Sequence, residues 1–264
     1  MEESNTTTTT LVPAVARAAQ ILDLLANALK PLPSNEISRQ LGIPKSSTAN
    51  LCIELENLGF IVRKENGYKL GRKLVELGGK YLSGIDALRE YYDLCSSLPI
   101  LSRESSRIAI LDNTDVLYLG KYEGRQQIRL TANIGDRFPA ICTATGKALL
   151  ALLPEGEAVE RYKENPAGFV QMTDKSIKNI TQLKKELDET RKRGYAIDNE
   201  EATPGVVCFA IALSGLREDT SPVAVSATVL SQRLSPEFKQ SLLNDLFALG
   251  KSLSRSYIMV QSFR

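Results

Sequence analysis

The order of structural signals in residues 12–72 restricts the fold more than any other feature of the chain. The segment Lys64-Glu65-Asn66-Gly67 separates two short apolar stretches, Phe60–Arg63 and Tyr68–Leu70, and its Asn-Gly pair predicts a tight β-hairpin. Three helical segments precede the hairpin. Because helix, helix, turn, helix and hairpin follow one another in this order, we expect a winged helix-turn-helix over residues 12–72.

Residues that start or stop helices bound each of these three segments. The first helix, about Ala14–Ala28, is followed by prolines that break a helix. The second opens at Ser34 and ends before Gly42, and the third covers about Pro44–Leu58. The positions expected to face the core at helical spacing are Val15, Ala18, Ile21, Leu22, Leu25 and Leu29, then Ile37 and Leu41, then Thr48, Leu51, Cys52, Leu55 and Leu58.

The start of the third helix is the candidate DNA-reading element. In a helix-turn-helix protein this end enters the major groove. Short polar side chains let the backbone approach the groove, where Ser and Asn bond phosphates or base edges and lysine neutralises a phosphate. With the cations of the hairpin and two outlying arginines, the candidate DNA-binding residues are Arg17, Arg39, Lys45, Ser46, Ser47, Thr48, Asn50, Arg63, Lys64 and Lys69.

Two plainer interpretations of these residues remain open. Ser46, Ser47 and Thr48 could be capping and surface residues, and three-helix packing also occurs in protein-interaction modules. The charge distribution favours DNA. The whole chain carries a net charge of only +2, but residues 37–73 hold seven Lys or Arg against three Glu.

The residue types that are missing exclude several kinds of chemistry. The chain has no histidine, which excludes Ser-His-Asp, Cys-His and other imidazole-based catalysis. Cys52, Cys95, Cys142 and Cys208 lie far apart and form no CxxC pair, so no zinc site, other metal or cofactor is expected. Thr145–Ala148 lacks the glycine and hydroxyl that a P-loop requires. We therefore expect a protein that is not an enzyme.

The chain also lacks the usual signals for membranes and export. No apolar run approaches the roughly 20 residues of a membrane-spanning helix, and the first residues are acidic and threonine-rich rather than basic and apolar. We expect no membrane association, a cytoplasmic location and a disordered tail over residues 1–11.

Beyond the hairpin, the pattern becomes a linker helix followed by a mixed domain. Apolar residues from Leu74 to Leu88 continue at helical spacing and predict one helix over residues 73–92, which could pair with a partner chain. Residues 93–264 predict strands at Ile108–Leu111, Val116–Lys121, Gln127–Ala132, Val206–Leu213 and Val223–Leu230, and helices at Thr145–Leu153, Ile180–Arg193 and Pro236–Ser254. This order predicts one antiparallel sheet with helices packed on it.

These stretches carry a resemblance to the IclR family of bacterial regulators over about residues 12–258. In the N-terminal half it rests on Val15–Ala18, Ile21-Leu22, Glu36-Ile37, Leu41–Ser47, Leu55-Glu56, Leu58–Ile61 and Tyr68–Gly71. In the C-terminal half it rests on Ile134–Pro139, Thr143–Ala151, Arg193–Glu201 and Pro204–Ala210. The resemblance implies an α+β protein, in which a winged helix-turn-helix and linker helix precede a GAF-like α/β effector-binding domain at residues 93–264.

The resemblance also implies a function and a binding pocket. The protein is expected to bind double-stranded operator DNA as a homodimer or dimer of dimers and to respond to a small organic effector. Activator and repressor remain open; we favour a repressor released by an acid, aldehyde or lactone, because the inferred pocket is small and mostly apolar with one acid. The implied effector-binding residues are Leu119, Ile141, Ala144, Thr145, Gly146, Asp198, Val206, Cys208 and Ser226.

One departure from the family pattern and one rival function concern this pocket. Many family members carry a histidine where this chain has Ile141-Cys142, so we expect no imidazole- or metal-assisted effector binding and a more apolar wall on that side. A redox sensor built on Cys142 and Cys208 is the rival. Both cysteines lie in apolar contexts, and we therefore expect neither to switch.

Overall fold

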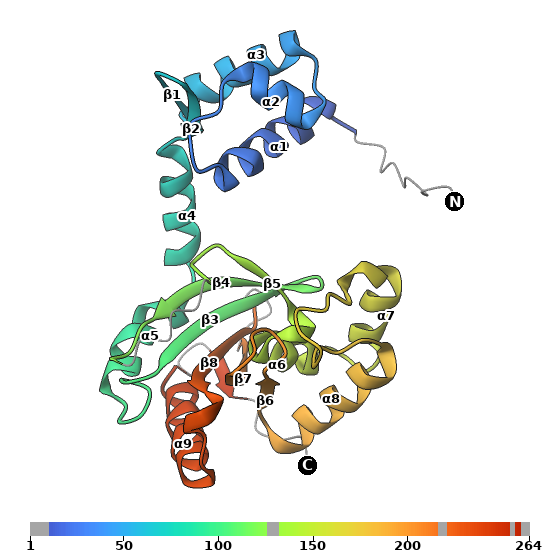
Figure 1. The fold of residues 1–264 in the computed structure, drawn as a ribbon. Helices are drawn as coiled ribbons and strands as arrows, with labels where there is room; N and C mark the ends of the chain where they lie inside the picture. The colour runs from blue at the N-terminus through green and yellow to red at the C-terminus, as the bar shows by residue number, and fades with distance from the viewer. Residues whose placement is uncertain (1–10, 126–131, 216–220, 254–256, 260–264) are drawn as a thin grey trace. The chain divides into compact units, whose positions relative to one another are not determined.

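The computed structural model describes residues 11–125, 132–215, 221–253 and 257–259, and the chain divides into two compact units, residues 1–84 and 85–264 (Figure 1). Residues 1–10 of the expected tail lie outside the described residues. The same holds for residues 127–131 of the expected third strand, while Ala132 lies in a loop. No helix in the described ranges combines the length and apolar character needed to cross a membrane.

The first unit is the predicted winged helix-turn-helix. Its elements are α1 (Pro13–Asn27), α2 (Ser34–Leu41), α3 (Lys45–Asn57), β1 (Ile61–Lys64) and β2 (Gly67–Leu70). Seven residues form its buried core: Ile21, Leu25, Ile37, Cys52, Leu55, Ile61 and Tyr68. The predicted stripes extend too far at their ends, since Val15, Leu29 and Leu58 are exposed. Leu29 and Leu58 follow the last helical residues, where the periodicity no longer applies.

The hairpin turn lies within the predicted segment Lys64–Gly67, and each strand extends one residue into that segment. Lys64 pairs with Gly67, so Glu65 and Asn66 occupy the turn and Gly67 begins β2. Gly67 has a φ of 137°, and a Cβ there would lie 2.2 Å from the carbonyl carbon of Leu32. Leu32 pairs with Tyr68, which ties the α1–α2 connection to the wing. The glycine is thus required by a close backbone approach and not by the turn itself.

The predicted single linker helix is wrong. The structure has two helices, α4 (Lys73–Ser83) and α5 (Asp86–Ser97), separated at Gly84-Ile85, where Ile85 is extended. Glycine is a weak helix former, and the division between the two units falls after it. In α4 no residue is buried, whereas α5 buries Ala87, Tyr91 and Cys95 within the second unit.

The second unit is built on the predicted antiparallel sheet. Among the described residues the sheet has seven strands in the order β5-β4-β3-β8-β7-β6, and β9 also pairs with β7. The strands are β3 (Ser105–Asp112), β4 (Asp115–Tyr122), β5 (Arg137–Pro139), β6 (Ala196–Asn199), β7 (Val206–Gly215), β8 (Val223–Leu230) and β9 (Tyr257–Met259). The short strands β5, β6 and β9 were not predicted from the sequence.

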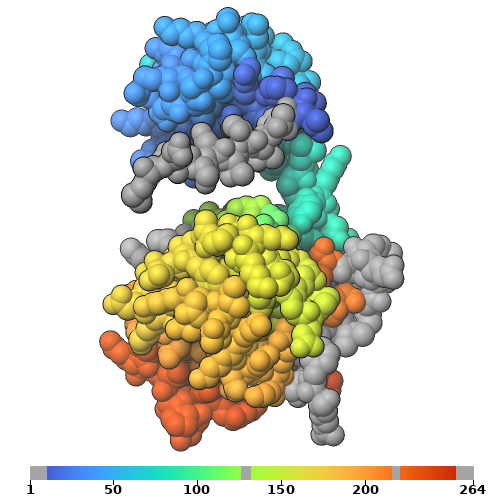
Figure 2. Space-filling model, turned by 90° about the vertical axis from the view of Figure 1, so that its right-hand side faces the viewer, coloured from blue at the N-terminus to red at the C-terminus, as the bar shows by residue number. Residues whose placement is uncertain are grey.

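Helices cover both faces of this sheet, as expected for a GAF-like α/β domain (Figure 1). The helices are α6 (Ala144–Leu152), α7 (Glu157–Glu164), α8 (Ile180–Arg193) and α9 (Pro236–Ser252), with 3₁₀ turns at Ala140–Cys142, Pro166–Gly168 and Ser231–Arg233. The sequence did not predict α7. In Figure 2, α7 and α8 form much of one side of this unit in yellow and orange. Helix α6 packs on β3, β6, β7 and β8, whereas α9 contacts β7 and β8 and also packs on α5.

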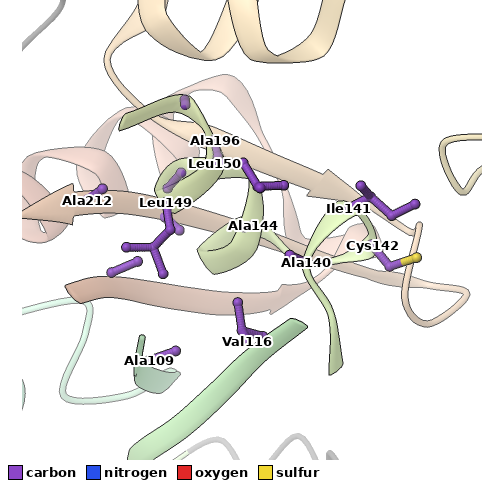
Figure 3. Packing of buried hydrophobic residues seen from close by; sticks show 14 of the residues in the cluster. Ala109, Val116, Ala140, Ile141, Cys142, Ala144, Leu149, Leu150, Ala196 and Ala212 are labelled. Atoms are coloured by element: carbon purple, nitrogen blue, oxygen red, sulfur yellow. The ribbon is translucent and has the colours of Figure 1, made fainter. Parts of the chain in front are cut away.

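The core beneath α6 consists largely of alanine. Ala109, Ala196, Ala210, Ala212 and Ala224 come from four strands and are buried in one cluster with Leu149 and Leu150 of α6 (Figure 3). These small side chains let the helix approach the sheet closely. Every residue of α6 except Leu152 is buried, so its N-terminal end is enclosed within the domain.

Candidate functional site

The start of α3 presents an open set of polar groups. Lys45, Ser46 and Asn50 are exposed and Ser47 is half-buried. The residue before the helix is Pro44, and no side chain caps the first amides. Because the first amides of a helix have no intrahelical acceptor and carry partial positive charge, they are suited to a phosphate oxygen.

Thr48 does not belong to this surface, which corrects its inclusion among the candidate DNA-binding residues. Its side chain is fully buried, and its hydroxyl donates to the Pro44 carbonyl oxygen at 3.2 Å. Thr48 lies one turn before Cys52, so both side chains face the core. Thr48 therefore anchors the start of α3 from inside.

The hairpin divides its cations between two faces. Arg63 pairs across the strands with Tyr68, donates to the Tyr68 hydroxyl at 2.5 Å and lies 3.8 Å from Glu56. Lys64 and Lys69 are exposed, and successive residues of a strand alternate between faces, so both lie on the opposite face from Arg63. Lys64 and Lys69 are thus the more accessible cations of the wing.

The two outlying arginines differ in their surroundings. Arg39 is exposed and forms an ion pair with Glu36 on its own helix at 2.5 Å, and Arg17 of α1 is half-buried. Exposed ion pairs of this kind are weak, so Glu36 leaves Arg39 able to contact a phosphate.

A partly open cavity lies at the N-terminal end of α6 in the second unit. The centre of a water molecule can reach about 50 Å³ of it, which is enough for several waters or a compact organic molecule. Its walls come from β3 to β8, from the start of α6 and from the loop after β6. The lining residues are Arg107, Tyr118, Ala132, Phe138, Thr143, Ala144, Thr145, Asp198, Ala202, Thr203, Val206, Cys208, Ser226 and Thr228.

Sheet register places the polar members of this wall. Asp198, Cys208, Thr228 and Ser105 form one row across β6, β7, β8 and β3. Ser226 and Arg107 are cross-strand neighbours two residues further along β8 and β3. Paired residues on neighbouring strands point to the same face, so these side chains converge below the start of α6.

Six of the nine residues expected in the pocket line the cavity: Ala144, Thr145, Asp198, Val206, Cys208 and Ser226. Leu119, Ile141 and Gly146 do not. Leu119 has no partner on β3, because the register shifts between Ile108 and Ala109. Tyr118 lines the cavity wall where Leu119 was expected. A shift of one residue exchanges the faces of a strand, and sequence alone did not reveal this bulge.

Ile141 and Gly146 were also expected in the pocket, but they lie behind its wall and do not line the cavity. Ile141 is fully buried in the core cluster beside Cys142, so the apolar wall expected there is core packing instead (Figure 3). A Cβ on Gly146 would lie 2.2 Å from the Ala140 carbonyl oxygen. Gly146 is therefore the point at which α6 meets the preceding 3₁₀ turn, and its amide is satisfied by the Thr143 hydroxyl at 3.1 Å.

Asp198 is buried and held in place by the backbone of the loop that follows it. Its Oδ1 accepts hydrogen bonds from the Glu201 amide at 2.7 Å and the Ala202 amide at 3.3 Å. Burial raises the pKa of the Asp198 carboxyl from 3.8 to about 6, although these bonds and Lys147 oppose the shift. We therefore expect Asp198 to gain and lose a proton near pH 6.

A buried ion pair fixes this loop to α6. The Lys147 ammonium is fully buried and lies 2.5 Å from Oε1 of Glu201 and 3.7 Å from Oε1 of Glu186. Burial also raises the pKa of the Glu201 carboxyl, and Lys147 opposes that shift. Because Glu201 also donates its amide to Asp198, Lys147 positions Asp198 relative to the start of the helix.

Sequence reasoning missed the most polar residue in the wall, Arg107. It occupies the middle of a strand that reads as buried, between Ser106 and Ile108, and only 3% of its surface is exposed. The prediction of a mostly apolar pocket with one acid is thus incomplete, because the cavity also contains a cation. A charged residue within an otherwise apolar strand was the available signal.

The cysteines do not have the properties of a thiol switch. Burial raises the pKa of the Cys142 thiol, which contacts the Val170 carbonyl oxygen at 3.2 Å. Burial also raises the pKa of Cys208, which lies 3.4 Å from the Thr228 hydroxyl. Reactive thiols have lowered pKa values, so both residues are poor candidates for redox sensing. No group of three or more metal-ligating side chains occurs among the described residues.

Comparison with known proteins decides the family. The profile described as "IclR helix-turn-helix domain" matches residues 14–65, and that described as "Bacterial transcriptional regulator IclR C-terminal" matches residues 79–255. The chain belongs to the IclR family. The HTH-type transcriptional regulator XynR of Escherichia coli is 32% identical over 93% of this chain and 97% of its own.

Solved structures agree with this assignment. The IclR protein of Thermotoga maritima superposes with a TM-score of 0.67 at 26% identity, covering 91% of this chain and 98% of that one. The repressor BlcR of Agrobacterium tumefaciens gives a TM-score of 0.58 at 29% identity, covering 92% and 96%.

The protein is therefore a DNA-binding transcriptional regulator with a helix-turn-helix domain and a C-terminal effector-binding domain. Its relatives are regulators from a family that is not enzymatic, which confirms the expectation that the chain is not an enzyme.

Proposed function

We propose that this IclR-family protein is a repressor whose operator affinity falls when a small metabolite fills the cavity at the start of α6. The observation that supports it best is the cavity itself, which gathers a carboxyl, a guanidinium and several hydroxyls inside the unit that does not carry α3. Enclosed pockets with a few convergent polar groups are typical of small-molecule sites. Such a protein would act in the cytoplasm, where bacterial DNA lies.

The DNA contacts are assigned to α3 and the wing. Lys45, Ser46 and Asn50 are exposed at the helix start and Ser47 is half-buried there, while Lys64 and Lys69 are accessible on the hairpin. The serines and Asn50 would bond base edges or phosphates, and the lysines would neutralise phosphates. Arg17, Arg39 and Arg63 would contribute further phosphate contacts, with Arg63 also bound to Tyr68.

Repression and assembly form the second part of the proposal. BlcR, at 29% identity, is named a repressor, and this likeness supports repression here. A homodimer or dimer of dimers is supported by α4, which buries none of its residues and exposes Val75, Leu77 and Tyr81. Exposed apolar residues along one helix suit pairing with a second copy.

The DNA part is tested on the region upstream of the protein's own gene. Fluorescence anisotropy would compare the wild type with Lys45→Ala and with Lys184→Ala, which removes an exposed lysine from α8. We expect Lys45→Ala to weaken binding about tenfold and Lys184→Ala to leave it unchanged. Equal affinity of all three proteins would remove α3 from the DNA contact.

The effector part is tested by filling the cavity. Ala202 lines the cavity from the loop after β6 and is only half-buried, so Ala202→Leu adds volume with little cost to the core. The variant should bind the same DNA as the wild type but no longer be released by a metabolite extract. Normal release of Ala202→Leu would place the effector elsewhere.

A further inference from the structure

This inference rests on the proposed function and narrows the chemistry of the effector. We propose that the effector is a small carboxylate and that Arg107 of β3 holds its anionic group, so that Arg107 determines the preference for an acid over its neutral analogues. The sequence left three classes of effector open: acids, aldehydes and lactones. This assignment selects the acids and excludes the other two classes.

Arg107 is a buried cation whose bonding capacity is largely unused. Only 3% of its surface is exposed, yet it lines the cavity. Within the described ranges, its Nε has no hydrogen-bond acceptor, and its Nη2 donates to the Ala132 carbonyl oxygen at 3.4 Å. The guanidinium lies over the Tyr118 ring, 5.7 Å from the ring centroid. A neutral carbonyl and a ring leave most of the charge uncompensated.

No acidic side chain in the described parts of the chain lies within 4.0 Å of Arg107. The two acids nearest the cavity are engaged elsewhere. Asp198 accepts from the amides of Glu201 and Ala202, and Glu201 pairs with Lys147. Lys147, which is fully buried in the same domain, is therefore paired, whereas Arg107 has no acidic partner within the described residues.

Burying an unpaired charge is costly, so such a group is retained where it recognises an opposite charge. A guanidinium presents parallel N–H donors whose spacing matches the two oxygens of a carboxylate. Binding an acid would supply the missing acceptor for Nε. An aldehyde or a lactone would supply a neutral oxygen and leave the buried charge unneutralised.

The other residues of the cavity wall can contact the part of a small acid that is not its carboxylate. The hydroxyls of Thr145, Ser226 and Thr228 and the first amides of α6 can bond a hydroxyl or oxo group, while Tyr118 and Phe138 present ring surface. The accessible space of about 50 Å³ suits a compact ligand.

The test uses matched acid and amide probes on the full-length protein. Isothermal titration calorimetry at pH 7.5 would compare pyruvate, lactate and benzoate with pyruvamide, lactamide and benzamide. We expect at least one acid to bind at least tenfold more tightly than its amide. In Arg107→Met this acid-to-amide ratio should fall to near one, and Arg107→Lys should restore part of it. Arg137→Met, which removes an exposed cation paired with Asp112, should keep the full ratio.

A second readout separates recognition from a structural role. If Arg107 is kept for a ligand, Arg107→Met should raise the Tm of the ligand-free protein while losing the Tm increase that the acid gives the wild type. A lower ligand-free Tm for both Arg107→Met and Arg107→Lys would show that the residue supports the fold instead and would overturn the proposal.

The outcomes also distinguish this inference from the proposed function. If no probe acid is preferred over its amide, or if Arg107→Met keeps the preference, then the assignment of Arg107 is wrong. Upstream DNA that is bound and then released by a metabolite extract would leave the regulator itself intact in either case. Absence of DNA binding together with a normal acid preference would overturn the proposed function but not this inference.

Discussion

Two helices of this protein begin with mostly small residues but occupy opposite environments. Helix α3 starts with Lys45-Ser46-Ser47 and keeps its first two side chains exposed, without a capping side chain. Helix α6 starts with Ala144-Thr145-Gly146, all of them buried, and Thr143 caps it. Both ends offer backbone amides to an acceptor, so what distinguishes them is access: the first is open to a large polyanion and the second only to a small molecule.

The strongest test of this contrast replaces the third residue of each helix with alanine. A Cβ on Gly146 would lie 2.2 Å from the Ala140 carbonyl oxygen, and a backbone atom cannot move aside as a flexible side chain can. We expect Gly146→Ala to reduce the free energy of unfolding by about 3 kcal/mol or more. Ser47→Ala should change it by less than about 0.5 kcal/mol. Urea denaturation followed by circular dichroism measures both, and equal effects would remove the contrast.

A pH profile tests the enclosed site. The pKa of Asp198 is about 6 in the folded protein against 3.8 for a free carboxyl, so between these values the folded state binds more protons. The free energy of unfolding should therefore fall as pH rises from 4 to 6. Above pH 6 the contribution of Asp198 to this free energy should stay at its low value. Two pKa units correspond to about 3 kcal/mol at most.

Asp198→Asn keeps an oxygen for the Glu201 and Ala202 amides but cannot ionise. The variant should be more stable than the wild type at pH 7, and the difference should shrink toward pH 4. Denaturation midpoints at pH 4, 5, 6 and 7 give this comparison. A difference that is constant with pH would show that Asp198 does not titrate in this range.

The salt dependence of DNA binding tests the open helix start. If Lys45 neutralises one phosphate, Lys45→Ala should lower the slope of log affinity against log salt by about 1 and cost about 1.4 kcal/mol at moderate salt. The control Lys184→Ala should keep the wild-type slope. A reduced affinity with an unchanged slope would assign Lys45 a role other than phosphate contact.

The smallest expected effect concerns the cap. Thr143→Val keeps the shape of the side chain but loses the oxygen that accepts from the Gly146 amide at 3.1 Å. Loss of a cap costs about 1 kcal/mol, and the buried amide would remain unpaired. Thermal unfolding would measure this cost. Full stability in Thr143→Val would mean that the preceding 3₁₀ turn alone fixes the start of α6.

The sequence allowed more of the first unit than of the second to be predicted. In residues 12–72, local signals dominate: helix starts, a glycine at the end of α2 with a φ of 64°, and an apolar hairpin. The errors there, such as the exposed Leu58 and the strands that extend one residue into the predicted turn segment, amount to one or two residues. The break at Gly84-Ile85 was missed because apolar spacing continues through it.

The cavity depends on long-range register, which a single sequence does not encode visibly. Arg107 and Asp198 are 91 positions apart in the chain and meet only because β3, β8, β7 and β6 are neighbours. The shift at Ile108/Ala109 put Tyr118 in the wall where Leu119 was expected. The expected residues that line the cavity, including Ala144, Asp198 and Cys208, came from the family resemblance and not from the residues alone.

The central claim is that an acid held inside the second unit controls DNA binding by the first. The most direct measurement is operator affinity by fluorescence anisotropy with and without the preferred acid, for wild type, Arg107→Met and Arg137→Met. We predict that the acid weakens binding at least tenfold in the wild type and in Arg137→Met but not in Arg107→Met. An acid effect of the same size in all three proteins, or in none of them, would contradict the account.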